Sequence, residues 1–211
     1  MRRVLIDARQ PAAAALAEAV AVLLSGGVVA VPTDTLYGLA ADPFSTAAIA
    51  RVFAVKGRPA QRAMPLVAAD VDQVVSQIGP LSELAQRLAA KYWPGPLTLL
   101  VERPRSIPPD VAGGRNEIGV RVPAHAVTRE LCRACARPLT ATSANLSGEP
   151  PSSDPDQIER AFGDGVDLLL DAGRTPGGAP STIVDVTGRD ARLVRPGAIA
   201  WDDVQACMQR G

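Results

Sequence analysis

The pattern of apolar and polar positions along the chain predicts a protein of alternating strands and helices. Short apolar runs bounded by proline, glycine or polar residues are typical of buried strands. Such runs occur at 27–32, 65–69, 97–102, 118–123, 138–145, 166–171, 181–187 and 191–196. Apolar residues that recur every three or four positions predict helices, and these cover 11–24, 46–54, 81–92, 124–136, 155–162 and 202–209.

Residues at the helix ends agree with this pattern. Ser45 is expected to cap the second helix, and Asp154, followed by Pro155 and Gln157, gives the fifth helix strong start signals. Strands and helices alternate irregularly, and two strands follow each other near the C-terminus. We therefore expect one α/β domain over residues 1–211, with a twisted, mixed parallel and antiparallel sheet flanked by helices.

Composition narrows the function classes. The 211 residues carry a formal net charge of zero, so binding to nucleic acid or to a membrane surface would depend on a local basic patch. Aromatic residues make up 3% of the chain, which weighs against binding RNA through a stacking platform. No uninterrupted apolar run is long enough to span a membrane. We expect no membrane association and a cytoplasmic location.

Three cysteines and one histidine give little support for a disulfide framework or a metal site. Cys132 and Cys135 have the C-x-x-C spacing of redox and zinc sites, but a zinc ion needs four ligands. The pair falls inside the predicted helix over 124–136, so we interpret both as structural thiols. His125, at the start of this helix, is interpreted as an ordinary surface residue, and no metal-binding residues are expected.

Polar stretches at the ends of predicted strands and helices hold the candidate chemistry, because rigid scaffolds place functional side chains there. One stretch carries Lys56, Arg58 and Arg62, although the chain has only one other lysine, Lys91. Three cations on a polar loop after a helix suit a phosphate, since lysine gives a compact charge and arginine a planar fork. Alternatively, and with equal weight, the three cations form a solvated cluster at the C-terminus of a helix and bind no ligand.

Two further stretches carry candidate polar groups. Ser143 and Asn145 alternate after an apolar strand, so an extended segment would point both the same way. They suit phosphate or sugar oxygens, although a turn that satisfies its own backbone is the simpler interpretation. Arg121 lies between valines in a strand predicted to be buried. A buried guanidinium needs an anion, so we expect an internal carboxylate, with a ligand carboxylate as the slightly weaker alternative.

Taken in order, several motifs resemble those of the YrdC/Sua5 family, the threonylcarbamoyl-AMP synthases that start the t6A modification of tRNA. These motifs are "PTDTLYGL" (32–39), K-x-R (56–58), "WPGPLT" (93–98), "VRVP" (120–123), S-x-N (143–145) and "STIVD…RPG" (181–197). The likeness covers nearly the whole chain, and the motifs are specific only in combination. It implies the YrdC-like fold, with a concave basic face, in the short form of the family.

The resemblance also implies a reaction. L-threonine, bicarbonate and ATP would condense to threonylcarbamoyl-AMP and pyrophosphate, with Mg²⁺ carried by the triphosphate. The protein would bring several anions together by positioning and electrostatics, so no dedicated nucleophile is needed. By resemblance, the catalytic residues are Lys56, Arg58, Ser143 and Asn145; the ATP-binding residues are these four with Arg62, Ser153 and Arg195; the threonine-binding residues are Thr35, Arg121 and Ser181, with Arg121 on the carboxylate.

The chain departs from the family pattern at two positions. Archaeal-type members read K-x-R-P-x-x-N-P-L, followed closely by a histidine near the threonine. Here Met64 precedes Pro65, and Ala69 stands where that histidine would fall, so no ligand contact is assigned to either residue and the strictness of threonine specificity stays open. Arg62 is similar to an extra basic residue of the bacterial short form.

Two other functions remain open from the sequence. The first is a non-enzymatic module that binds double-stranded RNA or tRNA through a local basic patch. The second is a paralogue that adenylates a different carbamoyl substrate on the same scaffold. For the synthase, a downstream threonylcarbamoyl transferase complex is the expected partner, and direct binding of tRNA is left open.

Overall fold

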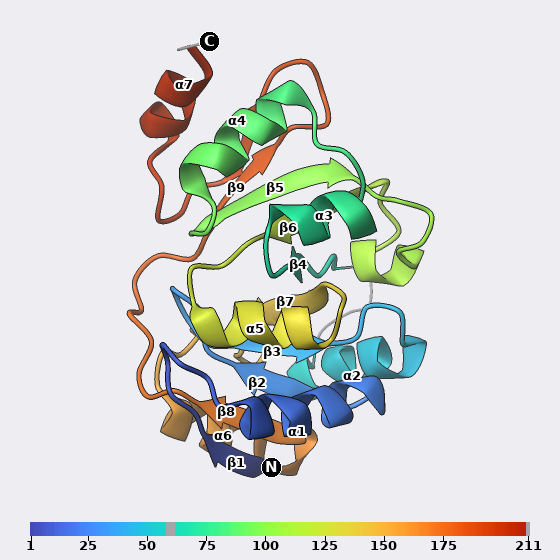
Figure 1. The fold of residues 1–211 in the computed structure, drawn as a ribbon, viewed down its shortest axis with the longest axis vertical. Helices are drawn as coiled ribbons and strands as arrows, with labels where there is room; N and C mark the ends of the chain where they lie inside the picture. Colours follow the sequence, from blue (N-terminus) through green and yellow to red (C-terminus); the bar gives the residue numbers. More distant parts are fainter. Residues whose placement is uncertain (58–61, 210–211) are drawn as a thin grey trace.

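The computed structural model describes residues 1–57 and 62–209, and in this part of the chain the strands form one ten-stranded sheet (Figure 1). The strands are β1 (Arg2–Leu5), β2 (Val29–Val31), β3 (Gly38–Ala41), β4 (Leu66–Val67), β5 (Leu97–Glu102), β6 (Glu117–Arg121), β7 (Leu139–Ser143), β8 (Leu168–Asp171), β9 (Thr182–Asp185) and β10 (Arg192–Arg195). Their order across the sheet is β1-β8-β2-β3-β7-β4-β6-β5-β9-β10.

Parallel and antiparallel neighbours are interspersed in this sheet. β8 pairs in parallel with β1 and β2, and β9 pairs in parallel with β5. The pairs β2–β3, β3–β7, β5–β6 and β9–β10 are antiparallel. The mixed sheet flanked by helices is therefore confirmed.

The helices are α1 (Ala13–Leu24), α2 (Thr46–Lys56), α3 (Val71–Gln77), α4 (Glu83–Tyr92), α5 (Ala126–Ala134), α6 (Pro155–Phe162) and α7 (Trp201–Gln209), with short 3₁₀ turns at Pro109–Ala112 and Gly163–Gly165. Both expected caps are confirmed. The Ala48 N–H donates to Ser45 Oγ (3.2 Å), and the Asp156 N–H donates to Asp154 Oδ1 (3.0 Å).

Three elements were not predicted from the sequence. β1 carries two charged residues among four, and β3 reads "GLAA", so neither gives a strong strand signal. β3 lies between β2 and β7, which shows that pairing with neighbours made it a strand. α3 spans seven residues, too few to establish a helical period, although its N-cap Asp70 accepts from the Gln73 N–H at 2.9 Å.

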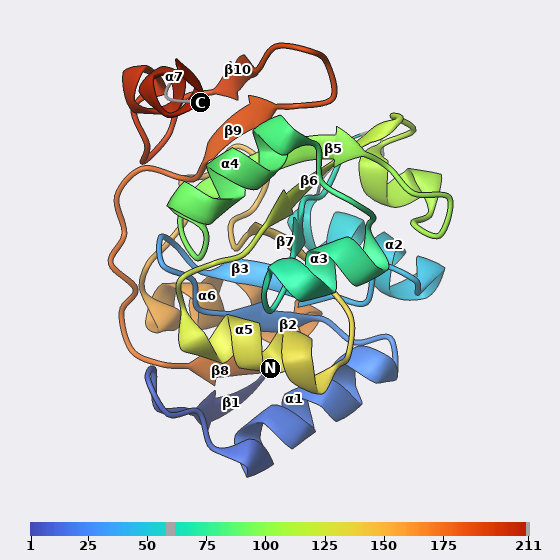
Figure 2. The same cartoon turned by 45° about the horizontal axis from the view of Figure 1, so that its top comes forward.

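Two apolar cores lie against the sheet. One is formed by α1 and α5, which pack side by side, together with residues of β2 and β8 (Figure 2). The larger core includes residues of α2, α3, α4, α6 and α7. Helices α4 and α7 pack together at the end of the sheet that carries β9 and β10, so α7 and the N-terminal strand β1 lie at opposite ends of the molecule (Figure 1).

The cysteine pair is structural, as expected from the sequence. Cys132 lies in α5, Cys135 is the residue that ends it, and both are buried free thiols. Burial raises the pKa of both groups, to about 11 for Cys135, so neither is a reactive thiolate at neutral pH.

The interpretation of His125 as a surface residue was incomplete. The ring is half-buried at the N-terminus of α5, and its Nδ1 is buried without a hydrogen-bond partner among the described residues. In that part of the chain, no helix has the length and apolar character needed to cross a membrane.

Candidate functional site

A cavity of about 390 Å³ opens on one face of the sheet. Leu97 and Leu99 of β5 point into the larger core, so Thr98 between them points to the opposite face, where it lines the cavity. Every strand from β3 to β10 in the sheet order contributes at least one lining residue. The cavity therefore crosses seven neighbouring strands and draws its side chains from distant parts of the sequence.

Most of the predicted site residues meet in this cavity. Eight of them line it: Thr35, Lys56, Arg62, Arg121, Ser143, Asn145, Ser181 and Arg195. Ser153 is absent from the lining of the described cavity, and Arg58 lies outside the described residues.

Lys56 lies deeper in the protein than the sequence indicated. It is the last residue of α2 rather than part of a polar loop, and its side chain is buried. Gly57 ends the helix with a φ of +58°, a conformation that glycine adopts without the cost a Cβ would bring. The chain therefore turns away at Gly57 and leaves the Lys56 ammonium against the end of β7.

The Lys56 ammonium organises the S-x-N turn. Its Nζ donates to Ser143 O, to Asn145 O (2.9 Å) and to Asn145 Oδ1 (3.2 Å). The Ser147 N–H donates back to Lys56 O at 2.9 Å. Buried charges are stable when hydrogen bonds replace their hydration, and these contacts do so for this cation.

Ser143 and Asn145 face each other instead of standing in parallel along an extended strand. β7 ends at Ser143, whose Oγ donates to Asn145 Oδ1 at 2.5 Å. The Asn145 amide then donates to Leu146 O (3.0 Å) and Glu149 O (2.5 Å). Both residues line the cavity, so the turn satisfies its own backbone and also presents polar groups to a ligand.

Arg121 has the internal carboxylate that the sequence favoured. The side chain is buried; its Nε donates to Gly95 O (2.9 Å) and its Nη2 donates to Asp34 Oδ1 (2.5 Å). Asp34 was not predicted as a site residue, although it stands in the "PTDT" motif and Arg121 required an anion. Gly95 belongs to the "WPGPLT" motif, so the ion pair and the Gly95 hydrogen bond of Arg121 together join three of the motifs.

Arg195 lies beside Ser181, one of the three residues predicted to bind threonine. Its Nη2 donates to Ser181 O (2.6 Å) and Ser181 Oγ (3.1 Å), and Ser181 Oγ shares a hydrogen bond with Thr98 Oγ1 (2.8 Å). Partial burial, followed by the positive charge of Arg121, lowers the pKa of Arg195. Because these two cations act on each other in one cavity, an anionic ligand would be stabilised there.

Gly197 of the "RPG" motif allows Arg195 to reach Ser181. A Cβ on Gly197 would lie 2.3 Å from Pro180 O and 2.5 Å from the carbonyl carbon of Ser181, distances that backbone atoms cannot accommodate. The Ala198 N–H donates to Pro180 O at 2.9 Å in the same contact. Only glycine fits this close approach of the two segments.

The loop between β2 and β3 contributes hydroxyl groups. Thr33 Oγ1 and Thr35 Oγ1 lie 3.1 Å apart, and Thr33 Oγ1 donates to Leu36 O at 2.7 Å. Thr33, Tyr37 and Thr98 line the cavity but were missed, because small or aromatic side chains within motifs carry no charge signal of their own.

The two positions that depart from the family pattern are buried in the cores. Met64 is fully buried in the larger core, and Ala69 is buried in the core under α1 and α5. Neither lines the described cavity. The structure therefore gives them packing roles.

The fold and this cavity define an α/β protein whose mixed sheet carries a site of cations and hydroxyl groups. The chain belongs to the Sua5/YciO/YrdC family, because the family model described as "Telomere recombination" matches residues 21–197. The resemblance expected from the motifs is confirmed.

Two proteins similar in sequence to this chain have the same name. The chain is 38% identical over 188 residues to the threonylcarbamoyl-AMP synthase of Marinobacter nauticus, covering 88% of this chain and 99% of that protein. It is 34% identical over 180 residues to the threonylcarbamoyl-AMP synthase of Pyrococcus abyssi, covering 85% of this chain and 53% of that protein. The chain thus spans about half the length of the P. abyssi relative.

The structural comparison gives the same family. The crystal structure of P. abyssi Sua5 complexed with L-threonine matches with a TM-score of 0.93 at 30% identity, covering 99% of this chain and 61% of that one.

Proposed function

We propose that this protein is a threonylcarbamoyl-AMP synthase, which condenses L-threonine, bicarbonate and ATP to threonylcarbamoyl-AMP and pyrophosphate. One observation carries the proposal: eight residues chosen from separate motifs line a single cavity. The names of the M. nauticus and P. abyssi relatives, and the L-threonine in the P. abyssi Sua5 complex, support the reaction and the amino acid.

The proposed mechanism relies on positioning. The carbamate formed from threonine and bicarbonate would attack the α-phosphate of ATP, and every reacting group is an anion. Arg121, beside Asp34, would take the threonine carboxylate, while Lys56, with Ser143 and Asn145, would hold the phosphate side. Like charges are brought together at low cost when preorganised cations face them in a partly desolvated cavity.

Three further assignments belong to this proposal. Arg62, Arg195, Ser153 and, outside the described residues, Arg58 would complete the nucleotide contacts. Mg²⁺ would be held by phosphate oxygens and water, the ligands this small hard ion prefers. The product would pass to a threonylcarbamoyl transferase complex for t6A modification of tRNA in the cytoplasm, where ATP and tRNA are available.

The proposal is tested by measuring pyrophosphate release from ATP, with L-threonine and bicarbonate omitted in turn. Release that requires both, together with threonylcarbamoyl-AMP identified by mass spectrometry, is the expected result. Release without threonine would replace the proposal with an adenylating enzyme for another carbamoyl substrate. A folded protein that releases no pyrophosphate but binds tRNA with steep salt dependence would be an RNA-binding module.

A further inference from the structure

The segment that joins β8 to β9, residues 172–181, connects the two ends of the cavity. It starts beside Tyr37, runs along one side of the molecule (Figure 1, orange), and ends at Pro180 and Ser181, which line the cavity. Ser181 is held locally by Thr98 and Arg195, and the anchoring of this segment is the further link that sets its position relative to Thr35.

Thr175 is the central anchor of this segment. It is a buried polar residue, and its Oγ1 donates to Thr35 O at 3.0 Å. Its backbone N–H donates to Ser153 O, also at 3.0 Å. One residue thus contacts the loop that carries Thr35, assigned to threonine, and the loop that carries Ser153, assigned to the nucleotide.

Neighbouring contacts fix the same segment on both sides of Thr175. Gly177 donates its N–H to Thr35 O at 2.8 Å, so this carbonyl accepts two hydrogen bonds. The Tyr37 hydroxyl donates to Gly173 O (2.8 Å) and accepts from the Ala172 N–H (3.3 Å). Tyr37 is fully buried and lines the cavity, so its hydroxyl ties the start of the segment to the cavity wall.

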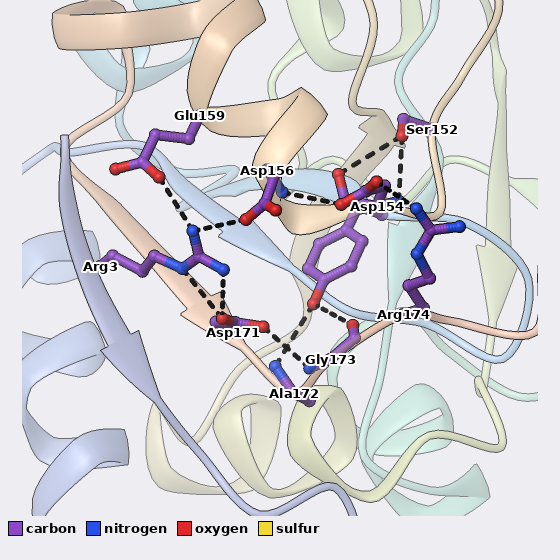
Figure 3. A network of polar contacts seen from close by, with 10 residues as sticks. Arg3, Ser152, Asp154, Asp156, Glu159, Asp171, Ala172, Gly173 and Arg174 are labelled. Carbon is purple, nitrogen blue, oxygen red and sulfur yellow. Dashed lines mark hydrogen bonds and ion pairs between the residues drawn. The ribbon is translucent and has the colours of Figure 1, made fainter.

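Charged residues surround the start of the segment (Figure 3). Arg3 binds Asp171, whose Oδ1 accepts from the Gly173 N–H at 2.8 Å, and Arg174 binds Asp154 at 2.6 Å. The Arg174 side chain is 74% exposed, and exposed ion pairs contribute little to stability. The buried hydrogen bond of Thr175 is thus expected to contribute more to the path of the segment than the exposed Arg174–Asp154 pair.

We propose that Thr175 is a positioning residue. It holds Ser181 at a fixed position relative to Thr35, so that these two predicted threonine-binding residues contact the same ligand. The proposal rests on the proposed function for its kinetic consequence. Its structural part, the anchoring of Gly177 to Thr35 O, does not.

The test compares Thr175→Val, Thr175→Ser and Thr140→Val with the wild type. Valine removes the Oγ1 donor at nearly constant shape, and serine keeps it. Thr140 is the matched control, because it is also a buried threonine whose hydroxyl contacts backbone atoms, those of Ala41, and it does not line the cavity. The readouts are kcat and KM for L-threonine and ATP, thermal stability, and amide hydrogen exchange at Gly177.

We expect Thr175→Val to raise the threonine KM by about fivefold to tenfold, with kcat changed by less than about twofold, as for loss of one buried hydrogen bond. Exchange at Gly177 should accelerate, and Thr175→Ser should restore both values. Thr140→Val should lower stability and leave the threonine KM and Gly177 exchange unchanged.

Two results would overturn the inference. Gly177 protection that survives in Thr175→Val would show that Thr175 does not anchor the segment, whatever the activity. Faster exchange in a Thr175→Val protein that turns over threonine with wild-type KM would show that the register of Ser181 does not matter. If the wild type makes no threonylcarbamoyl-AMP, the proposed function fails, and the exchange measurement still decides the anchoring.

Discussion

The two sides of the cavity hold their cations in different ways. On the side assigned to the nucleotide, the ammonium of Lys56 is bound to the backbone carbonyls of Ser143 and Asn145. On the side assigned to threonine, the guanidinium of Arg121 is paired with the side chain of Asp34. The first cation shapes a turn, whereas the second is oriented by a carboxylate.

This difference has a physical consequence for each side. A cation bound to neutral carbonyls keeps its full charge, so the field of Lys56 remains available to a phosphate even though its donors are engaged. A cation paired with a carboxylate is held in one orientation and part of its field is offset, which suits recognition by geometry more than by charge. The nucleotide side is thus expected to select for charge, and the threonine side for shape.

The largest effect is expected from Lys56→Ala. Adenylate formation should fall by at least about 100-fold, since a preorganised cation is lost and the S-x-N turn loses its centre. Loss of the Lys56 donor to Asn145 O should also cost about 1 to 3 kcal/mol of stability, whereas Ser143 O still accepts from the Asn145 N–H. Pyrophosphate release and thermal unfolding measure both, with Lys91→Ala on the exposed face of α4 as the control. Near-normal turnover in a folded Lys56→Ala protein would show that Lys56 is not a catalytic residue.

Arg121→Ala tests the threonine side. The threonine KM should rise by about 100-fold and the ATP KM far less, because only one ligand loses its partner. The variant also leaves Asp34 unpaired, so Arg121→Lys, which keeps the charge without the fork, serves where the alanine variant unfolds. Arg137→Ala is the matched control, since Arg137 pairs with the buried Asp42 outside the cavity. Equal effects on both KM values would make Arg121 purely structural.

Gly197→Ala tests whether the threonine side depends on shape. The added Cβ would lie 2.3 Å from Pro180 O, so Pro180 and Ser181 must move. We expect a loss of about 1 to 3 kcal/mol in unfolding free energy and a higher threonine KM. Gly188→Ala should be neutral, because its Cβ would meet only Asp190 O at 3.9 Å. Similar unfolding curves for the two variants would refute the close-packing argument.

Asp34→Asn tests how much the negative charge of the paired carboxylate contributes. The amide oxygen still accepts from Arg121, but the charge-assisted bond is weakened and Gly95 O becomes the firmer partner. Enzyme assays should give a rise in threonine KM of about tenfold or less, clearly smaller than for Arg121→Ala. An effect as large as that of Arg121→Ala would mean that Asp34 contacts the ligand itself.

The smallest effect is expected from His125→Gln, at the N-terminus of α5, and it concerns the pH dependence of stability. Burial lowers the pKa of His125 below its ordinary 6.5, and the charge of Asp34 opposes this only in part. An unfolded histidine therefore takes up its proton at higher pH than the folded one, so wild-type stability should fall as the pH drops below about 6.5. Denaturant unfolding at pH 7 and pH 5.5 should show a smaller decrease for His125→Gln. Identical decreases would exclude His125 as the cause.

Much of the scaffold could be predicted from local pattern. Buried strands such as Leu97–Glu102 and capped helices such as Pro155–Phe162 carry their signal in consecutive residues. β3 and α3 were missed because their strand and helix states depend on neighbours in space. Lys56 was placed on a loop because sequence shows charge but not burial.

The sequence by itself determined which residue types were available for the site: Lys56, the S-x-N pair, and an arginine among valines that had to find an anion. Only the tertiary structure decided which anion Arg121 found, since Asp34 and Gly95 approach it through the strand order of the sheet. The same holds for Thr175 and Gly197, whose roles are contacts with distant segments. A contact between residues far apart in the chain leaves no periodic pattern, because its energy depends on packing across the fold rather than on the local backbone.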